Sequence, residues 1–292
     1  MKKVNILNIH QFHDGESPED FYANTLENHL QTRHKDINIP HKHDFYLAVL
    51  FTKGSGIHEV DFTSYKVNPG TMFFLNPGQT HHWELSADTR GYILFHTQAF
   101  YDLHYTHTKL NKFPFYYSVH NTPVLQIGEQ EKLVGLFKFI VEENTVAKPY
   151  QREAIASLLD MIYIEAARIY PAQSNGGTEF ENNYYTKYRQ FEELVGQQFS
   201  NERSPSAYAS MLNISAKHLN RISQSVVGKT AGDVILERVL LEAKRELVLR
   251  QNSFAQIAHL LGYEDYAYFS RLFKKKTGET PSAFISRYRK TP

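Results

Sequence analysis

The sequence predicts two domains: an N-terminal all-β barrel that carries a helical pair, and a C-terminal all-α domain made of tandem helix-turn-helix units. Three observations predict this fold class. Short apolar segments divided by turns fill residues 37–98, helical periodicity takes over at about residue 129, and a weak repeat fills the last third of the chain. At 292 residues the chain also suits two hydrophobic cores better than one.

The barrel is predicted from segments rich in β-branched, aromatic and aliphatic residues. The clearest are Phe45–Thr52, Ile57–Phe62 and Thr71–Leu75, and glycine- or proline-containing turns separate them. Short strands at close spacing indicate a small barrel or sandwich. Because no helical pattern of 10–15 residues falls between them, a parallel βαβ sheet is not expected.

Two amphipathic helices follow the strands. Apolar residues recur at i, i+3, i+4, i+7 and i+8 over residues 133–141 and again over 155–163, with a break at Lys148-Pro149. Such a short break predicts antiparallel neighbours. We expect the helices to cover the barrel and one of them to form a dimer contact, with Leu159 on an outward stripe.

A linker is predicted at Pro171–Thr178, which is polar and rich in glycine. The predicted domains are residues 1–170, a linker over 171–183, and residues 184–292. Within the last domain, Ser204 before Pro205 indicates a helix start. A long helix is expected from Asp233 to about Arg250, and a final helix from Pro281.

The repeat has copies that begin at residues 206 and 255. Arg221 matches Arg271 at an offset of fifty, whereas Ala209 matches Ala258 at forty-nine, so the second copy carries one extra turn residue. Each copy reads as a short helix, a turn, a second helix with a positive face, and a glycine stop. This is the helix-turn-helix plan, in which the second helix enters the major groove of DNA.

Charge divides the chain in the same place. Residues 1–181 hold 15 Lys+Arg against 21 Asp+Glu, and residues 182–292 hold 17 against 10. The basic segment is therefore the one expected to meet phosphate.

The absence of cysteine excludes disulfides and thiolate chemistry. With no bilayer-length apolar run and no export signal, we expect a cytoplasmic protein without a membrane partner.

Residue types on the second helix of each copy suit nucleic acid. Arg and Lys donate to guanine, and Asn can pair with adenine. The expected outward residues are Lys217, Asn220 and Arg221 in the first copy and Tyr266, Tyr268, Ser270 and Arg271 in the second, with Lys274, Lys275 and Lys276 placed for phosphate. Met211 and Leu260 are expected to point inward from the first helices.

Residues 184–290 closely resemble the DNA-binding domain of the AraC/XylS transcription regulators. The run from Tyr268 to Pro281, with Ala255-x-Ile257-Ala258 before it, carries the resemblance, while Ser223 and Gln224 depart from the pattern. The resemblance implies a double-stranded DNA operator and RNA polymerase as partners, and it favours an activator. It also implies that Lys217, Asn220 and Arg221 read bases and that Tyr266, Ala267 and Arg271 face the groove.

The front domain resembles a cupin, a barrel with two histidine motifs. His41-Lys-His43 and Pro77–His81 match the motifs, but Leu47 and Ala48 stand where metal-binding cupins carry a glutamate. We expect no metal and no cofactor, because that carboxylate is missing and strand alternation points His41 outward. The predicted ligand-binding residues at the barrel mouth are His43, Tyr46, His58, His81 and Trp83.

Together these patterns predict a homodimeric, one-component transcription regulator, not an enzyme. A small-molecule effector would bind in the front barrel, and sugars are a familiar effector class in the family. Two alternatives stay open at this point. One is a metal-dependent cupin enzyme fused to a DNA-binding domain, and the other is a DNA-binding protein without a ligand.

Overall fold

The computed structural model describes residues 6–12, 20–33, 37–105, 110–117, 122–128, 131–145, 147–170, 179–249 and 251–290. The chain divides into two compact units, residues 4–171 and 172–292, which are described separately. Residues 171–178 of the predicted linker lie outside the described residues, and residues 179–183 already belong to a helix. Among the described residues, no helix combines the length and apolar character needed to cross a membrane.

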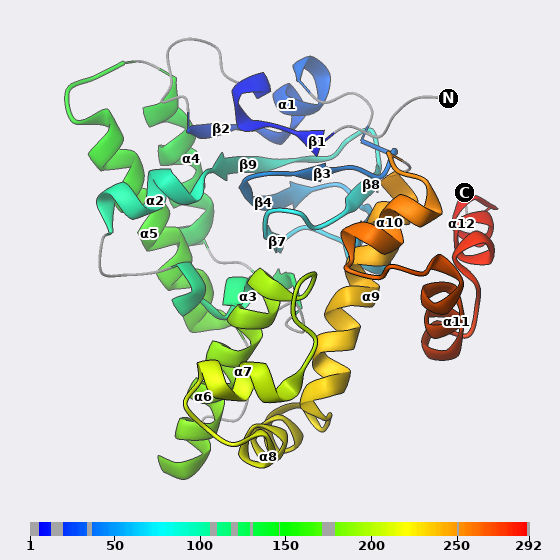
Figure 1. The fold of residues 1–292 in the computed structure, drawn as a ribbon. Helices are drawn as coiled ribbons and strands as arrows, with labels where there is room; N and C mark the ends of the chain where they lie inside the picture. The colour runs from blue at the N-terminus through cyan, green and yellow to red at the C-terminus, as the bar shows by residue number, and fades with distance from the viewer. Residues whose placement is uncertain are drawn as a thin grey trace. The chain divides into compact units, whose positions relative to one another are not determined.

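The first unit is built on two antiparallel sheets and one short parallel pair of strands, β1 and β3 (Figure 1). A five-stranded sheet has the order β10-β7-β4-β9-β2, a three-stranded sheet has the order β6-β5-β8, and β1 pairs with β3. The strands are β1 (Ile6–Leu7), β2 (Phe21–Thr25), β3 (Lys42–His43), β4 (Tyr46–Lys53), β5 (Gly56–Val60), β6 (Thr63–Val67), β7 (Thr71–Leu75), β8 (His81–Leu85), β9 (Arg90–His96) and β10 (Val124–Gln126).

The five-stranded sheet is buried on both faces. Leu47, Val49 and Phe51 of β4 enter an inner core that the three-stranded sheet completes with Val60, Val67 and Trp83. Ala48 and Leu50, at alternate positions, enter an outer core beneath the helices. This double burial explains why β4 is apolar without a break from residue 46 to residue 51, whereas a sheet with one wet face alternates apolar and polar residues.

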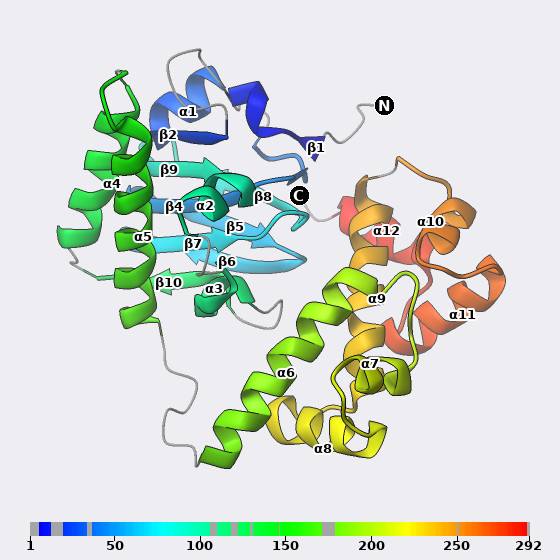
Figure 2. The same ribbon diagram turned by 60° about the vertical axis from the view of Figure 1, so that its left-hand side comes forward.

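Helices cover the outer face of that sheet (Figure 2). They are α2 (Gln98–His104), α3 (Pro114–Tyr117), α4 (Glu131–Asn144) and α5 (Gln151–Ile169); the 3-10 turns η1 (Ile9–Phe12) and η2 (Leu110–Lys112) and helix α1 (Leu26–Thr32) complete the unit. The predicted pair is confirmed as α4 and α5, which pack against each other.

The expected outward position of Leu159 is wrong. Its side chain is fully buried in the outer core with Ile155, Ile162 and Tyr163, because a five-stranded sheet is wide enough to accept both helices. The most exposed large apolar side chain among the described residues of this pair is instead Phe139 of α4, at 60% exposure, ahead of Met161 of α5 at 37%.

The second unit is all-helical. Its helices are α6 (Glu179–Gln198), α7 (Pro205–Met211), α8 (Ala216–Val227), α9 (Ala231–Leu249), α10 (Phe254–Leu260), α11 (Tyr266–Thr277) and α12 (Pro281–Lys290). One core joins α6, α7 and α8 to the start of α9. The long helix α9 then leads to α10, α11 and α12 (Figure 2).

The two repeat copies have matching geometry. Helices α7 and α10 both have 7 residues, and α8 and α11 both have 12. The turns span residues 212–215 and 261–265, so the second copy does hold one extra turn residue. Each turn contains one left-handed residue, Asn213 at φ 55° and Gly262 at φ 76°. The next residue's N–H donates to an equivalent carbonyl, Ala209 or Ala258.

The inward assignment of Met211 and Leu260 is wrong in both copies. These equivalent residues end α7 and α10 and are 42% and 53% exposed. A seven-residue helix has two turns, and the turn residues Leu212 and Leu261 supply the buried contact beyond its end.

Gly262 also permits a close approach between the two halves of this unit. A Cβ atom at residue 262 would fall inside the van der Waals radius of the Ser200 carbonyl oxygen, in the segment between α6 and α7. The Arg203 guanidinium donates to the Gly262 carbonyl and lies 3.9 Å from the centre of the Tyr263 ring. Glycine is therefore required here for space as well as for its backbone angle.

Exchanging the residue types at 213 and 262, the two positions with a left-handed backbone, separates the requirement for space from the requirement for that backbone angle. Asparagine tolerates a left-handed backbone, so Gly262→Asn tests only the close approach, and we expect it to destabilise the unit by about 1–3 kcal/mol. Asn213→Gly is the matched control and should change stability by less than about 1 kcal/mol. Urea unfolding followed by far-ultraviolet circular dichroism measures both. Equal stability of the two variants would show that position 262 has no steric constraint.

Candidate nucleic-acid interface and histidine cluster

Helix α8 has one buried face and one exposed basic face. The Ser215 hydroxyl caps the helix by accepting from the His218 N–H at 3.2 Å. Leu219 and Ile222 are fully buried, while Lys217 and Arg221 are exposed one turn apart. The structure thus brings the two predicted cations together on the solvent side of α8.

Two residues that sequence reasoning missed position Arg221. Its Nη2 atom lies 2.8 Å from His218 Nδ1, and its guanidinium carbon lies 5.9 Å from the centre of the Tyr184 ring in α6. Tyr184 is buried in the α6–α9 core. The helical spacing of His218 and Arg221 was a usable signal, but the contribution from α6 depends on tertiary packing.

Asn220 does not belong to this exposed set. Its side chain is half-buried, and its Oδ1 atom accepts from the Ala231 N–H at 2.9 Å, at the start of α9. Pairing with adenine needs both the oxygen and the nitrogen of the amide. We therefore correct the prediction and assign Asn220 to capping α9.

Helix α11 repeats the arrangement of α8. Asp265 caps the helix by accepting from the Ala267 N–H at 2.7 Å, and Phe269 and Phe273 are buried. Ala267, Tyr268 and Arg271 are exposed, as expected for a groove-facing surface. Tyr266 is half-buried and stacks on Phe254 with ring centres 5.8 Å apart, so much of its ring is used inside the unit.

The last turn of α11 carries a cluster of cations. Lys274, Lys275 and Lys276 are exposed. Lys276 Nζ lies 3.0 Å from Asp233 Oδ1 and ties α11 to α9. Lys274 and Lys275 therefore remain the better candidates for phosphate contacts.

Four of the five predicted ligand-binding residues meet in the inner core of the first unit. The His43, His58, His81 and Trp83 side chains are all at most 2% exposed. Tyr46 does not join them. Its ring stacks on His96 at 5.3 Å on the outer-core side, and its hydroxyl donates to Gln98 at 2.8 Å. Strand alternation places Tyr46 with Ala48, on the face away from the histidines.

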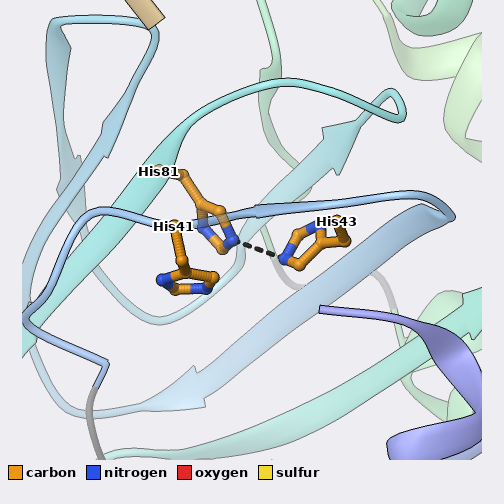
Figure 3. Close-up of side chains that lie close together, drawn as sticks. All are labelled: His41, His43 and His81. Atoms are coloured by element: carbon orange, nitrogen blue, oxygen red, sulfur yellow. Dashed lines mark hydrogen bonds between the residues drawn. The ribbon is translucent and has the colours of Figure 1, made fainter. Parts of the chain in front are cut away.

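The expected outward orientation of His41 is also wrong. His41 is 4% exposed, and its ring centre lies 4.3 Å from that of His81. The expectation misapplied strand alternation, because His41 and His43 are two residues apart and a period of two places them on the same side. Paired backbone hydrogen bonds with His81, in an isolated bridge, hold His41 there. Figure 3 shows the His41, His43 and His81 side chains close together.

Polar contacts link the imidazoles. His81 Nε2 lies 2.6 Å from His43 Nε2, and His81 Nδ1 lies 2.9 Å from His58 Nε2. Burial lowers the pKa of His41 to about 4 and lowers that of His58 well below its usual value. These two rings are therefore neutral at pH 7. Around the cluster, aromatic rings such as Phe45, at 4.6 Å from His43, fill the inner core.

Comparison with known proteins supports both halves of this description. Residues 26–127 match the model of the AraC-like ligand binding domain, and residues 208–287 match that of a helix-turn-helix domain. The MmsAB operon regulatory protein of Pseudomonas aeruginosa is 25% identical over 275 residues, which is 92% of this chain and 84% of the relative. The HTH-type transcriptional activator RhaR of Mannheimia succiniciproducens is 24% identical over 89% of this chain and 91% of its own.

Among solved structures, wild-type ToxT from Vibrio cholerae with a bound unsaturated fatty acid gives a TM-score of 0.47 at 13% identity. The match covers 92% of this chain and 96% of that one.

The two domain matches follow each other in the order of the two units and together span more than half of the sequence. The chain belongs to the AraC family of transcription regulators, with an AraC-like ligand-binding domain in front of a helix-turn-helix domain.

Proposed function

We propose that residues 179–290 bind a specific duplex operator with both helix-turn-helix units. The observation that carries this proposal is the equivalence of α8 and α11. Each is a capped twelve-residue helix with a buried apolar face and an exposed arginine, Arg221 or Arg271, at the same position. Arginine is well suited to reading guanine in the major groove.

The helix between the units has a suitable length for this role. Helix α9 has 19 residues, which corresponds to about 28 Å at 1.5 Å per residue. Successive major grooves on one face of B-DNA are about 34 Å apart. A connector of comparable length supports simultaneous entry of α8 and α11 into neighbouring grooves.

We further propose that the front unit controls DNA binding through a small-molecule effector. The match to an AraC-like ligand binding domain supports this role. Its site would be the inner-core end that holds His43, His58, His81 and Trp83, since these combine polar nitrogens with aromatic walls. An effector would act by binding two conformations of the regulator unequally.

Activation through RNA polymerase and a homodimeric state complete the proposal. Relatives such as RhaR are named transcriptional activators, which supports the direction of regulation. The relatives are named regulatory proteins, which disfavours the fused enzyme, and the match to an AraC-like ligand binding domain disfavours the ligand-free binder.

The two-unit model predicts the footprint of a fragment covering residues 172–292, which has a core of its own. Hydroxyl-radical footprinting on a selected duplex should show two protected segments about 10 bp apart on one face. Binding should weaken steeply with salt because phosphate neutralisation releases counterions. A single protected segment would contradict the use of both units.

Base-reading and phosphate-binding residues should respond differently to substitution. Arg221→Ala and Lys217→Ala should each reduce affinity for the selected site by about 1–3 kcal/mol and relax its sequence preference. Lys275→Ala should weaken selected and random duplexes alike. Competition titrations measure the ratio of the two affinities. If Arg221→Ala leaves that ratio unchanged, Arg221 is a phosphate contact.

The proposed dimer contact moves from Leu159 to the exposed apolar side chain of α4. Phe139→Glu would place an unpaired carboxylate in an apolar interface, which is costly, and should convert a dimer into a monomer. Lys138→Glu is the control for added negative charge at the neighbouring exposed position. Sedimentation velocity of the full chain distinguishes these states. A wild-type monomer at micromolar concentration would eliminate the contact.

A further inference from the structure

Against the expectation from the missing carboxylate that the barrel holds no metal, we propose that His41, His43 and His81 hold a divalent transition-metal ion of the zinc class. These three buried side chains each offer a ring nitrogen, and these atoms all lie within 4.8 Å of one another. Imidazole is a common ligand for zinc, nickel and copper, and three histidines suffice for a zinc site whose fourth position is taken by a non-protein ligand.

The hydrogen bonds around the cluster orient two of these rings for coordination. His41 Nδ1 lies 2.8 Å from the Ile39 carbonyl oxygen, which can only accept, so Nδ1 carries the proton and Nε2 is left with a lone pair. His81 Nδ1 lies 2.9 Å from His58 Nε2, and donation in that direction leaves His81 Nε2 as the ligand atom. Such outer contacts fix the tautomer of metal-binding histidines.

The spacing is close to what a metal requires. A tetrahedral zinc ion with Zn–N distances of about 2.0–2.1 Å holds its ligand nitrogens about 3.3 Å apart. His43 Nε2 and His81 Nε2 are 2.6 Å apart (Figure 3). Their separation would have to grow by about 0.7 Å to meet the zinc value, which is within the reach of small side-chain rotations.

The ligand set is entirely neutral. At the position where metal-binding cupins carry a glutamate, Leu47 points into the inner core. Since three imidazoles leave the charge of a divalent ion uncompensated, the fourth position favours an anion or a water molecule that loses a proton. His58 would be a positioning residue, because it contacts His81 and not the ion.

Metal analysis of the untagged full chain tests the proposal without reference to DNA binding. After dialysis against zinc and removal of free metal, plasma mass spectrometry should find one zinc per chain. His43→Gln and His81→Gln should abolish that stoichiometric binding. His82→Gln is the matched control, because His82 neighbours His81 but faces Glu59, 3.8 Å away. Zinc content below one-tenth of an equivalent in the wild type would overturn the site, as would equal loss in His82→Gln.

Two further measurements test the site even if the His43 and His81 variants fail to fold. Cobalt(II) added to the wild type should produce the intense visible absorption of a four-coordinate nitrogen site, and zinc should displace it. His58→Gln should keep one equivalent of metal but weaken its affinity by about tenfold to a hundredfold. A six-coordinate cobalt spectrum, or unchanged affinity in His58→Gln, would contradict the proposed geometry.

Discussion

Burial of both faces of the five-stranded sheet is the constraint that organises the ligand-binding unit. Leu47 and Ala48 are neighbours in sequence yet belong to different cores, one shared with the three-stranded sheet and one with α4 and α5. Both faces of the central strand β4 are covered. Polar side chains that point into either core must therefore find their hydrogen-bond partners inside the unit. The histidines do so in the inner core, through their contacts with one another.

The fold could be predicted best in segments where the apolar residues follow a single helical period. Helices α4, α5 and α9 and the two repeat copies follow from apolar spacing and from glycine stops, and they lie within a few residues of their predicted bounds. Strand β6 was harder to predict, because four of its five residues are at least partly exposed and its segment TSYKV lacks a strong apolar run.

Two of the errors at the candidate sites have a common physical origin. The orientation of Tyr46 cannot be deduced from alternation when both faces of a strand are apolar. The error at His41 is different, because its spacing of two residues from His43 already predicts the same side for both. Asn220 has a residue type suited to adenine, but its oxygen is already used by the backbone of the next helix. For Tyr46 and Asn220, a tertiary contact outweighs a local pattern.

The matching lengths and caps of α8 and α11 have a consequence for how operators diverge. A shift of fifty residues superposes the exposed positions of one helix on those of the other, while each helix is supported by its own buried side chains. Surface residues on either helix can then be exchanged without repacking its partner. Under the proposed two-unit binding, a change in one operator half-site can thus be matched on one helix alone, so the regulator can acquire new target sequences one half at a time.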